Sequence, residues 1–391
     1  MEKSSRYLLI SPAYPPPFIG GAKVYIYNMV EHCPENIDIL TSSLKDGRQE
    51  VSNPRHRIFR SRYIWDRIDV DPAPWNLLVS YAYLVTWFFR HRRLYKAVVV
   101  NAETFANGLF FLFAKFLGVP VIGVGYGDEY TLALKSRTLK GWIKRTFLTS
   151  VQNKADGFIV VCDFAKQILV SLGVDPARVD VIGPTINPAK VRSLPETKAR
   201  GRRVISVGRL MERKGFHKLI ESIDRLKAKF PDIHLSIVGE GPYKQKLTDE
   251  VSQRNLGSYV SIRGAVSDQE LARLYENSDL FVLANMMLAN GNTEGCPTVF
   301  VEAAACGLPV IGGTDSGAST AIEDGRTGFI ANSRNIDELS ERIDRILRDP
   351  GLAESMAKAG IAKVLRDHLP ERAGAEFYRS LARFSDRLDS K

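Results

Sequence analysis

Two carboxylates, Glu294 and Glu302, lie eight positions apart in the run TEGCPTVFVEAAACGLPVIGG, which spans residues 293–313. A proline before the short apolar stretch and a glycine after it predict a short helix, since proline suits a first turn and glycine the residue past the end. The backbone amides of that first turn, those of Thr298 and Val299, would bind an anion with help from the helix dipole. We therefore expect a phosphate at this helix start and a hydroxylated group, such as a ribose, on Glu302. A buried crossover helix with two incidental glutamates explains the same residues.

Two cations follow the first strand that we expect in the second half of the chain. Arg209 lies in a GRL run and Lys214 in a KG pair, at the carboxyl end of the sheet where ligands of α/β proteins bind. We expect a fixed guanidinium that binds a pair of phosphate oxygens and a mobile ammonium that adds a point charge. Gly241 lies in a second glycine loop, GEGP, at the same edge, where a base or ribose could approach the backbone. Three loops at one edge indicate a diphosphate site, although an Arg and Lys pair alone would be ordinary surface residues.

The first half of the chain begins with a comparable arrangement. An apolar run over residues 6–11 predicts a buried strand, and Gly20 and Gly21 precede a helical segment over residues 22–31. A strand, a glycine loop and a helix in this order let a backbone approach a phosphate. The pair is not a GxGxxG fingerprint, so two glycines that only turn the chain remain an alternative.

Strands and helices alternate along the chain, and this alternation predicts parallel, doubly wound α/β sheets. A length of 391 residues suits two domains of similar size. The periodicity stops between residues 183 and 203, where proline, glycine and charged residues accumulate. We expect a first domain over residues 1–185, a linker over 186–203, a second domain over 204–370 and a helix over 371–391 that crosses back to the first domain.

The cysteines and histidines predict neither a disulfide framework nor a zinc site. The four cysteines form no CxxC pair, and the six histidines are far apart in the sequence. Asp69 and Asp71 form a DVD run similar to a metal-chelating DxD, but they lie among basic residues and not at the end of an apolar strand. The first residues lead directly into a strand and lack the features of a signal peptide. We therefore expect a cytoplasmic protein without a metal.

The net charge of +10 belongs almost entirely to the first half of the chain. Residues 1–195 hold 25 Lys and Arg against 16 Asp and Glu, whereas residues 196–391 hold 29 against 28. Basic residues are frequent over 55–96 and over 135–154, with aromatic residues among them, and the apolar segment 77–89 is too short to span a bilayer. Such stretches suit an anionic membrane surface or an anionic substrate. A solvated basic helix has the same composition.

The runs VGRLMERKG, VGEGP, SDLFVLA, EGCPTVFVEAAACGLPVI and DGRTGFI follow one another over about residues 204–330. In order and spacing they resemble the retaining glycosyltransferases of family four, which have the GT-B fold. The resemblance implies two Rossmann-like domains that face a central cleft, with the donor held mainly by the second domain and the acceptor by the first. It also implies metal-independent transfer of a hexose-type sugar, with retention, from a UDP- or GDP-sugar to a hydroxyl of a glycan or lipid-linked acceptor, in the assembly of bacterial envelope, exopolysaccharide or glycolipid.

The resemblance further implies a role for each candidate residue. Arg209 and Lys214 would hold the diphosphate, and Gly21 would approach it from the first domain. Glu302 would hold the ribose, while Glu294 would contact the donor sugar beside the bond that breaks. The other donor-binding positions are Gly241, Gly295, Thr298 and Val299.

Three positions depart from the commoner family pattern. Tyr126-Gly127 stands where many members have His-Gly, so the role of that histidine would pass to the Tyr126 hydroxyl or to Asp128, unless the GYGDE stretch is only a turn. Pro297 stands where a glycine is frequent, and Thr320 where an acidic residue is frequent. A sugar epimerase or phosphorylase of the same fold, or an inactive nucleotide-sugar-binding protein, are the alternative functions.

The expected partners follow from this function and from the charge. We expect a nucleotide-sugar donor, a glycan or lipid-linked acceptor and no nucleic acid. The basic first domain would dock peripherally on the inner face of an anionic membrane to reach its acceptor. A soluble, anionic acceptor is the competing explanation of that charge.

Overall fold

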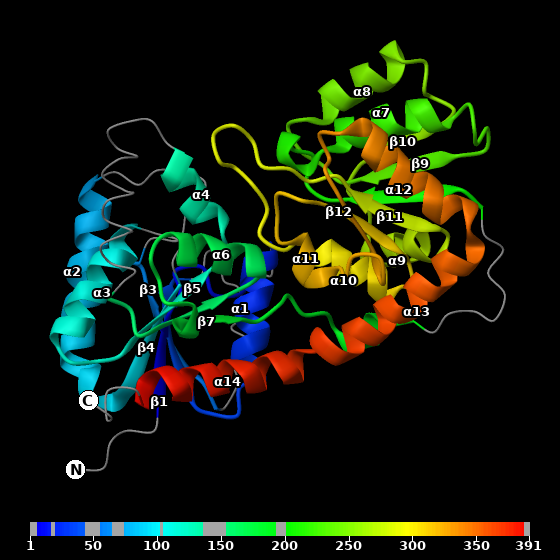
Figure 1. Ribbon diagram of the computed structural model, residues 1–391. Coiled ribbons are helices and arrows are strands. Elements are labelled where there is room, and N and C mark those ends of the chain that lie inside the picture. Colours follow the sequence, from blue (N-terminus) through cyan, green and yellow to red (C-terminus); the bar gives the residue numbers. More distant parts are fainter. Residues whose placement is uncertain are drawn as a thin grey trace. The chain divides into compact units, whose positions relative to one another are not determined.

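The computed structural model describes residues 6–16, 20–43, 55–64, 74–101, 105–135, 154–192 and 201–386. Contacts within the chain divide it into two compact units, here called the first unit and the second unit. The first unit comprises Met1–Val161, Ala165–Ile182 and Pro370–Lys391, and the second comprises Cys162–Phe164 and Gly183–Leu369. In the described residues each unit contains a parallel sheet with helices packed on it (Figure 1).

Among the residues that the structure describes, the sheet of the first unit has seven strands in the order β3-β2-β1-β4-β5-β6-β7, and its paired strands are parallel. The strands are β1 (Arg6–Ile10), β2 (Ile37–Ser42), β3 (Arg57–Ser61), β4 (Tyr95–Asn101), β5 (Val121–Gly125), β6 (Gly157–Val160) and β7 (Val179–Val181). Strand β4 reads YKAVVVN and is buried apart from its second residue, as expected for a strand covered on both faces. The strand order reverses between β1 and β4, which places a switch point at their carboxyl ends.

Helices cover both faces of this sheet. The helices are α1 (Gly21–Glu31), α2 (Pro74–His91), α3 (Phe105–Phe116), α4 (Asp128–Lys135), α6 (Asp163–Ser171) and α14 (Pro370–Asp386). A Cβ added at Gly157 of β6 would lie 2.2 Å from the ring of Phe384 in α14. The next residue, Phe158, lies against Gly123, on the face that carries Phe111 of α3. Because neighbouring strand residues point to opposite faces, α14 and α3 cover opposite sides of the sheet.

A buried carboxylate joins four neighbouring strands at their amino ends. Asp38 of β2 has no exposed side-chain surface, and its Oδ1 accepts from Nε of Arg6 in β1 at 2.8 Å and from Nε of Arg57 in β3 at 3.0 Å. Its Oδ2 accepts from the hydroxyl of Tyr95 in β4 at 3.0 Å. Burial alone would raise the pKa of Asp38, but the hydrogen bonds from Arg57 and Arg6 outweigh it and lower the pKa.

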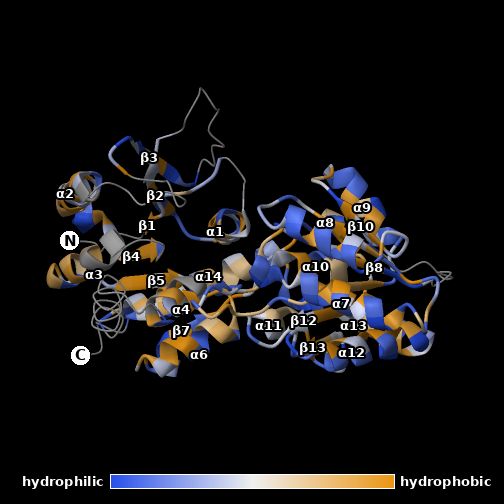
Figure 2. Cartoon of the chain, turned by 90° about the horizontal axis from the view of Figure 1, so that it is seen from above, coloured by the Kyte–Doolittle hydropathy of each residue, from blue (hydrophilic) through white to orange (hydrophobic). Residues whose placement is uncertain are grey.

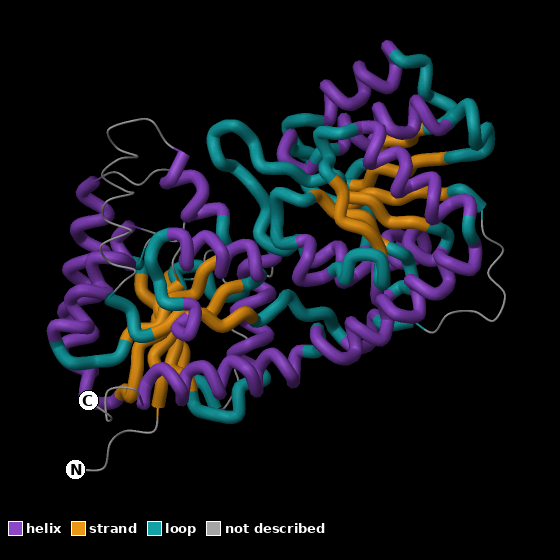
Figure 3. Tube along the Cα trace, viewed as in Figure 1, coloured by secondary structure: helices purple, strands orange, loops and turns teal. Residues whose placement is uncertain are grey.

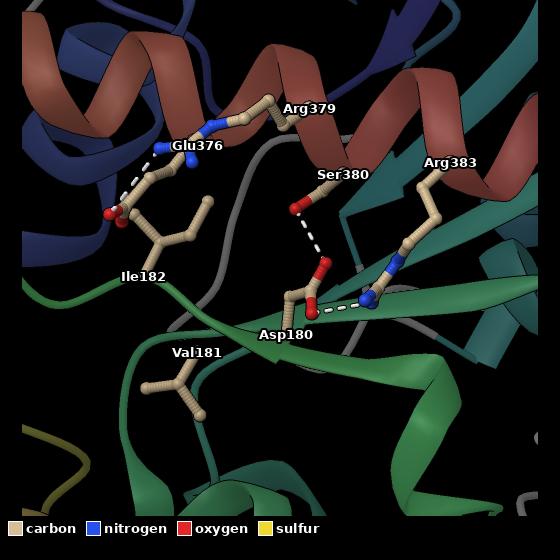
Figure 4. Close-up of a pocket in the computed structure, with 7 residues that line it drawn as sticks. All are labelled: Asp180, Val181, Ile182, Glu376, Arg379, Ser380 and Arg383. Carbon is tan, nitrogen blue, oxygen red and sulfur yellow. Dashed lines mark hydrogen bonds and ion pairs between the residues drawn. The ribbon is translucent and has the colours of Figure 1, made fainter.

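The last helix is attached to the edge strand of the first sheet. Asp180 of β7 accepts hydrogen bonds from Ser380 of α14, at 2.7 Å, and from Arg383, beside a pocket of about 380 Å³ between strand and helix (Figure 4). One residue past β7, the carbonyl of Ile182 accepts from the hydroxyl of Tyr25 in α1 at 2.8 Å. These contacts hold residues 180 and 182 against α14 and α1, directly before the chain enters the second unit.

In the described residues the sheet of the second unit has six strands in the order β10-β9-β8-β11-β12-β13, also parallel. Figure 3 shows these strands side by side with helices around them. The strands are β8 (Arg203–Val207), β9 (His234–Val238), β10 (Val260–Arg263), β11 (Leu280–Leu283), β12 (Val310–Gly313) and β13 (Gly328–Ala331). Relative to the chain this is the order 3-2-1-4-5-6 of a dinucleotide-binding sheet, with its switch point between β8 and β11. The doubly wound α/β architecture predicted from the sequence is confirmed.

The helices of the second unit are α7 (Phe216–Leu226), α8 (Lys244–Gln253), α9 (Asp268–Glu276), α10 (Thr298–Ala305), α11 (Ala318–Ala321), α12 (Ile336–Arg348) and α13 (Pro350–Asp367). Helix α12 buries Leu339, Ile343 and Ile346, which follow one another at helical spacing, and it packs on α7. Figure 2 shows hydrophobic residues along the strands, whereas the exposed faces of α12 and α8 are hydrophilic.

Some elements differ from the sequence expectations. Strands β2 and β3 lie in a region where no strand is predicted, and β13 follows the last predicted strand of the second unit. The GYGDE loop is shorter than expected, because Gly125 ends β5 and Asp128 begins α4. Apart from Cys162–Phe164, which belong to the second unit, the chain passes between the units after Ile182 and before Pro370, whereas the boundaries expected from the sequence lie at 185 and 370.

Replacing Asp38 with asparagine should lower the free energy of unfolding by about 2–3 kcal/mol, because the guanidinium groups lose a buried anion. Urea unfolding measures this change. Since the pKa of Asp38 is lowered in the folded state, its contribution is present above the pKa of an unfolded aspartate and is lost as the pH falls through the folded-state pKa. Asp232→Asn, at the exposed pair with Arg202, is the control and should cost less than about 0.5 kcal/mol. Equal losses in both variants would contradict the role assigned to Asp38.

Candidate functional site

The loop after β8 is fixed against the end of β11, at the switch point of the second sheet. It ends in a short 3₁₀ turn, Glu212–Lys214, followed by Gly215 in a left-handed conformation with φ 69°. A Cβ at Gly215 would lie 1.8 Å from the carbonyl oxygen of Ala284, directly after β11. Only glycine fits this position, so the contact sets where the preceding Lys214 lies.

Arg213, Lys214 and Glu294 form a group of three charged side chains that we call the Glu294 cluster. Nζ of Lys214 lies 2.9 Å from Oε2 of Glu294, and Nε of Arg213 donates to Oε1. The side chains of Arg213, Lys214 and Glu294 are 21%, 11% and 13% exposed, so the charges are largely withdrawn from water. Burial alone would raise the pKa of Glu294, but Lys214 and Arg213 outweigh it and lower the pKa. Glu294 is therefore an anion at neutral pH.

The residues on both sides of Glu294 are fixed to the loop after β12. The hydroxyl of Thr293 donates to the carbonyl oxygen of Asp315 at 2.7 Å. On the other side the carbonyl oxygen of Gly295 accepts from the N–H of Gly317 at 2.6 Å. A Cβ at Gly317 would lie 2.4 Å from the Gly295 oxygen, so the two loops approach as closely as glycine allows. Gly295, predicted as a donor-binding residue, thus has a packing role beside Glu294.

The structure reverses the expected behaviour of the two cations. Lys214, expected to be mobile, is buried and paired with Glu294. Arg209, expected to be fixed, is exposed and has no hydrogen bond or ion pair with any described residue. The sequence expectation is wrong because the side-chain types do not reveal that Glu294 already binds the lysine. Arg209 is consequently exposed to a ligand at this edge, whereas Lys214 would reach a ligand from a buried position.

Helix α10 begins as predicted, at Thr298. Pro297 is the residue before the first helical turn, with φ −59° and ψ 123°, rather than part of that turn. The amides of Thr298 and Val299 belong to the first turn, where helix geometry provides no partner within the helix. They follow Glu294 by four and five residues, so the Glu294 cluster and this helix start belong to one short segment.

Glu302 lies one turn further along α10, in a different electrostatic environment from Glu294. Burial raises its pKa above the usual range, and the positive charge of Lys190 reduces this effect without reversing it. The pKa values of the two predicted carboxylates are therefore shifted in opposite directions. Glu294 is held as an anion by two cations, whereas Glu302 accepts a proton more readily than an ordinary glutamate.

Gly241 connects the second glycine loop to the loop after β8. The N–H of Leu210 donates to the carbonyl of Glu240 at 2.9 Å, and the N–H of Tyr243 donates to the carbonyl of Leu210 at 3.0 Å. A Cβ at Gly241 would lie 2.3 Å from the Leu210 oxygen. This glycine therefore permits close packing of the two loops, which positions the neighbouring Arg209.

In the first unit the structure brings Gly21 and Tyr126 together. Gly21 is the first residue of α1, and the ring of Tyr126 lies 5.8 Å from that of Tyr25 in the same helix. The Tyr126 hydroxyl donates to the carbonyl oxygen of Ala22 at 3.4 Å. Both predicted residues thus lie at the carboxyl ends of β1 and β5. Asp128 is the first residue of α4.

Arg213 is the residue of this site that the sequence analysis did not predict. It lies directly before Lys214 in the run ERKG, and this pair of adjacent cations is the one local feature of the sequence that points to it. Its importance depends on a partner 81 positions away, Glu294, and no local pattern reports such a contact.

No metal site is evident in the part of the chain that the structure describes, where no group of three or more His, Cys, Asp or Glu side chains could hold an ion. The DVD run at Asp69 and Asp71 lies outside the described residues, as does most of the basic stretch 135–154.

Two family models match the chain. The model described as "Glycosyl transferases group 1" matches residues 192–363, which contain the Glu294 cluster. The model described as "Glycosyltransferase Family 4" matches residues 19–190, which contain Gly21 and Tyr126. Together the matches cover most of both units.

Two curated proteins illustrate the similarity in sequence. The chain is 29% identical over 234 residues to the GDP-mannose-dependent alpha-(1-6)-phosphatidylinositol monomannoside mannosyltransferase of Mycolicibacterium smegmatis, covering 56% of this chain and 61% of that protein. It is 28% identical over 218 residues to the amylovoran biosynthesis glycosyltransferase AmsK of Erwinia amylovora, covering 55% of this chain and 54% of that protein. The matches thus span little more than half the length of these relatives.

Solved structures share the fold over nearly the whole chain. Anabaena HepE, solved with UDP, has a TM-score of 0.72 and 16% identity, over 97% of this chain and 100% of that chain. Sucrose-phosphate synthase from Thermosynechococcus elongatus has a TM-score of 0.74 and 18% identity, over 99% of each chain.

Proposed function

Since the chain belongs to the family 4 glycosyltransferases and has their GT-B fold, we propose that it transfers a hexose from a nucleoside diphosphate sugar to a hydroxyl group. The observation that carries this proposal is the Glu294 cluster at the switch point, four residues before the start of α10. A diphosphate needs positive charge and amide donors in one place, and the exposed Arg209, Lys214 and the start of α10 provide both.

The donor is a UDP- or GDP-sugar. HepE was solved with UDP and with UDP-glucose, and the mycobacterial relative is GDP-mannose-dependent by name. Arg209 and Lys214 bind the diphosphate, while Gly21 lies at the corresponding switch point of the first unit. Glu302, whose pKa is raised by burial, accepts a hydrogen bond from a ribose hydroxyl.

The reaction proceeds with retention and without a metal. The bond between the anomeric carbon and the diphosphate breaks, and its electron pair stays on the phosphate oxygen. The acceptor hydroxyl forms the new bond on the same face and gives its proton to that oxygen. Arg209, Lys214 and the amides of Thr298 and Val299 stabilise the leaving charge in a preorganised way. Glu294 contacts the sugar and orients it.

The acceptor is a glycan or a lipid-linked glycan of a bacterial envelope. One relative is named as a phosphatidylinositol monomannoside mannosyltransferase, and another is named for amylovoran biosynthesis. These names support a glycolipid or an exopolysaccharide as the acceptor. Tyr126 and Asp128 border the acceptor side, because they follow β5 at the edge where α1 begins.

Lys214→Gln and Arg209→Gln should each weaken UDP or GDP binding about ten- to a hundredfold, since each removes a charge-assisted contact worth about 1.5–3 kcal/mol. Calorimetry measures the affinity, and incubation of the parent protein with UDP- and GDP-sugars and envelope glycans measures transfer. NMR of the product reports the anomeric configuration. Binding without transfer on any acceptor would favour the inactive binding protein, and unchanged affinity in both variants would disprove the diphosphate site.

Tyr126→Phe should lower turnover by about tenfold or more while leaving nucleotide affinity unchanged, if the hydroxyl acts on the acceptor. The substitution retains the ring contact with Tyr25. Tyr25→Phe is the matched control, because it removes a hydroxyl from the same ring pair whose partner is the Ile182 carbonyl. Turnover that stays at the parent level in both Tyr126→Phe and Asp128→Asn would show that this loop is structural.

Helix α2 provides a surface for peripheral membrane contact in the first unit. Its outer side exposes Trp75 (73%), Leu78 (60%) and Phe89 (49%), and the guanidinium of Arg92 lies 4.1 Å from the Phe89 ring centre. Apolar and aromatic side chains next to arginines suit the interface of an anionic bilayer. Within the described residues no helix is long and apolar enough to cross a membrane.

Replacing both Trp75 and Leu78 with glutamine should reduce binding to phosphatidylglycerol-containing vesicles at least about tenfold, since burying each side chain contributes about 1.5–3 kcal/mol. Flotation measures the bound fraction, and added salt should release the parent protein. Leu365→Gln, at an exposed leucine of α13 in the second unit, is the control and should float like the parent. A parent protein that does not float at low salt would favour a soluble acceptor instead.

A further inference from the structure

The two cations of the Glu294 cluster differ in what surrounds them. Arg213 uses Nε for Glu294, and its Nη1 lies 3.2 Å from the sulfur of Met211. Its carbonyl oxygen accepts from the N–H of Met286 at 2.8 Å, so the backbone is fixed as well. The Nε and Nη1 sides of this guanidinium thus contact Glu294 and Met211.

Lys214 has N–H groups that Glu294 does not use, and it lies beside the end of β8. Its Cε and Nζ lie 3.5 and 3.7 Å from the position of a Cβ at Gly208, at the carboxyl end of β8. An ammonium has three N–H groups, of which Glu294 Oε2 takes one. Lys214 thus keeps two N–H groups beside the end of β8, the place at which the diphosphate of the proposed donor would bind.

This difference affects Glu294 when the donor binds. Lys214 and Arg213 are the charged groups that lower the pKa of Glu294. The loop after β12 bonds to Thr293 and Gly295 through backbone atoms of Asp315 and Gly317, and the Asp315 carboxylate pairs with Arg334. A diphosphate that shares Lys214 weakens the hold of the lysine on Glu294. The bond from Arg213 to Oε1 involves the other carboxylate oxygen and does not use Lys214.

We propose that Arg213 is a positioning residue that keeps the Glu294 carboxylate oriented toward the donor sugar while Lys214 engages the diphosphate. The proposal rests on the proposed function, because it assigns Lys214 and Glu294 to the two parts of one donor. The two adjacent cations then have different effects. Lys214 contributes to nucleotide affinity, whereas Arg213 contributes to the rate of sugar transfer by orienting Glu294. The competing possibility is that Arg213 binds the diphosphate itself.

The test compares Arg213→Gln, Arg213→Lys and Lys214→Gln. We expect Arg213→Gln to bind UDP and GDP within about twofold of the parent protein but to lose about tenfold or more in turnover, with partial recovery in Arg213→Lys. Lys214→Gln should show the opposite division, with the main loss in affinity. A loss of UDP and GDP affinity in Arg213→Gln as large as in Lys214→Gln, or full turnover in Arg213→Gln, would overturn the proposal.

A second readout works without turnover and so separates this inference from the proposed function. Carboxyl carbon NMR of the glutamate-labelled protein follows the titration of Glu294, and Glu294→Gln identifies its signal. With UDP or GDP bound, Arg213→Gln should raise the pKa of Glu294, because the persistent cation is lost, and Arg213→Lys should restore it. A Glu294 titration that is the same in Arg213→Gln and in the parent protein would overturn the positioning role, even if no sugar transfer is found.

Discussion

The second unit depends on one electrostatic arrangement, a buried carboxylate shared by two adjacent cations. Glu294 can remain charged at low exposure because Arg213 and Lys214 each bind one of its oxygens. A buried charge without such partners would cost several kcal/mol. The arrangement requires glycine at 215 and the attachment of residues 293 and 295 to the loop after β12. The positions of the three charged side chains therefore depend on how the loops pack at the ends of the strands.

The same topological rule operates in both units. In each sheet the strand order reverses once, and the neighbouring loops carry the candidate residues: Gly21 at one switch point and the Glu294 cluster at the other. A strand that ends beside a reversal leaves room for a ligand above the sheet, since no crossover helix fills that space. The Asp38 network lies at the opposite, amino ends of the first sheet, where it stabilises strand pairing without occupying the binding edge.

The architecture and the family can be predicted from the sequence, because glycine loops, buried apolar runs and helix starts are local signals. The family resemblance and the doubly wound fold are confirmed. Such signals fail where an outcome depends on distant partners. The local sequence does not reveal that Lys214 and Arg213 pair with Glu294, so it predicts neither the fixed position of Lys214 nor the role of Arg213. Strands β2 and β3 were missed because their residues mix polar and apolar types, with polar Asp38 buried by partners on three other strands. The assigned roles of Tyr126, Asp128 and the donor-binding residues remain predictions.

The discontinuity of the first unit bears on how the protein is made. Helix α14 packs against α1 and covers one face of the first sheet, yet it is encoded after the whole second unit. During synthesis the strands of the first sheet therefore leave the ribosome before α14 does, because Gly183–Leu369 are translated in between. The ring of Phe384 fills the space beside Gly157, and Ser380 and Arg383 reach Asp180, only after that delay. The first sheet therefore cannot acquire its full cover before the last helix is translated, whereas the second unit is built from nearly contiguous sequence.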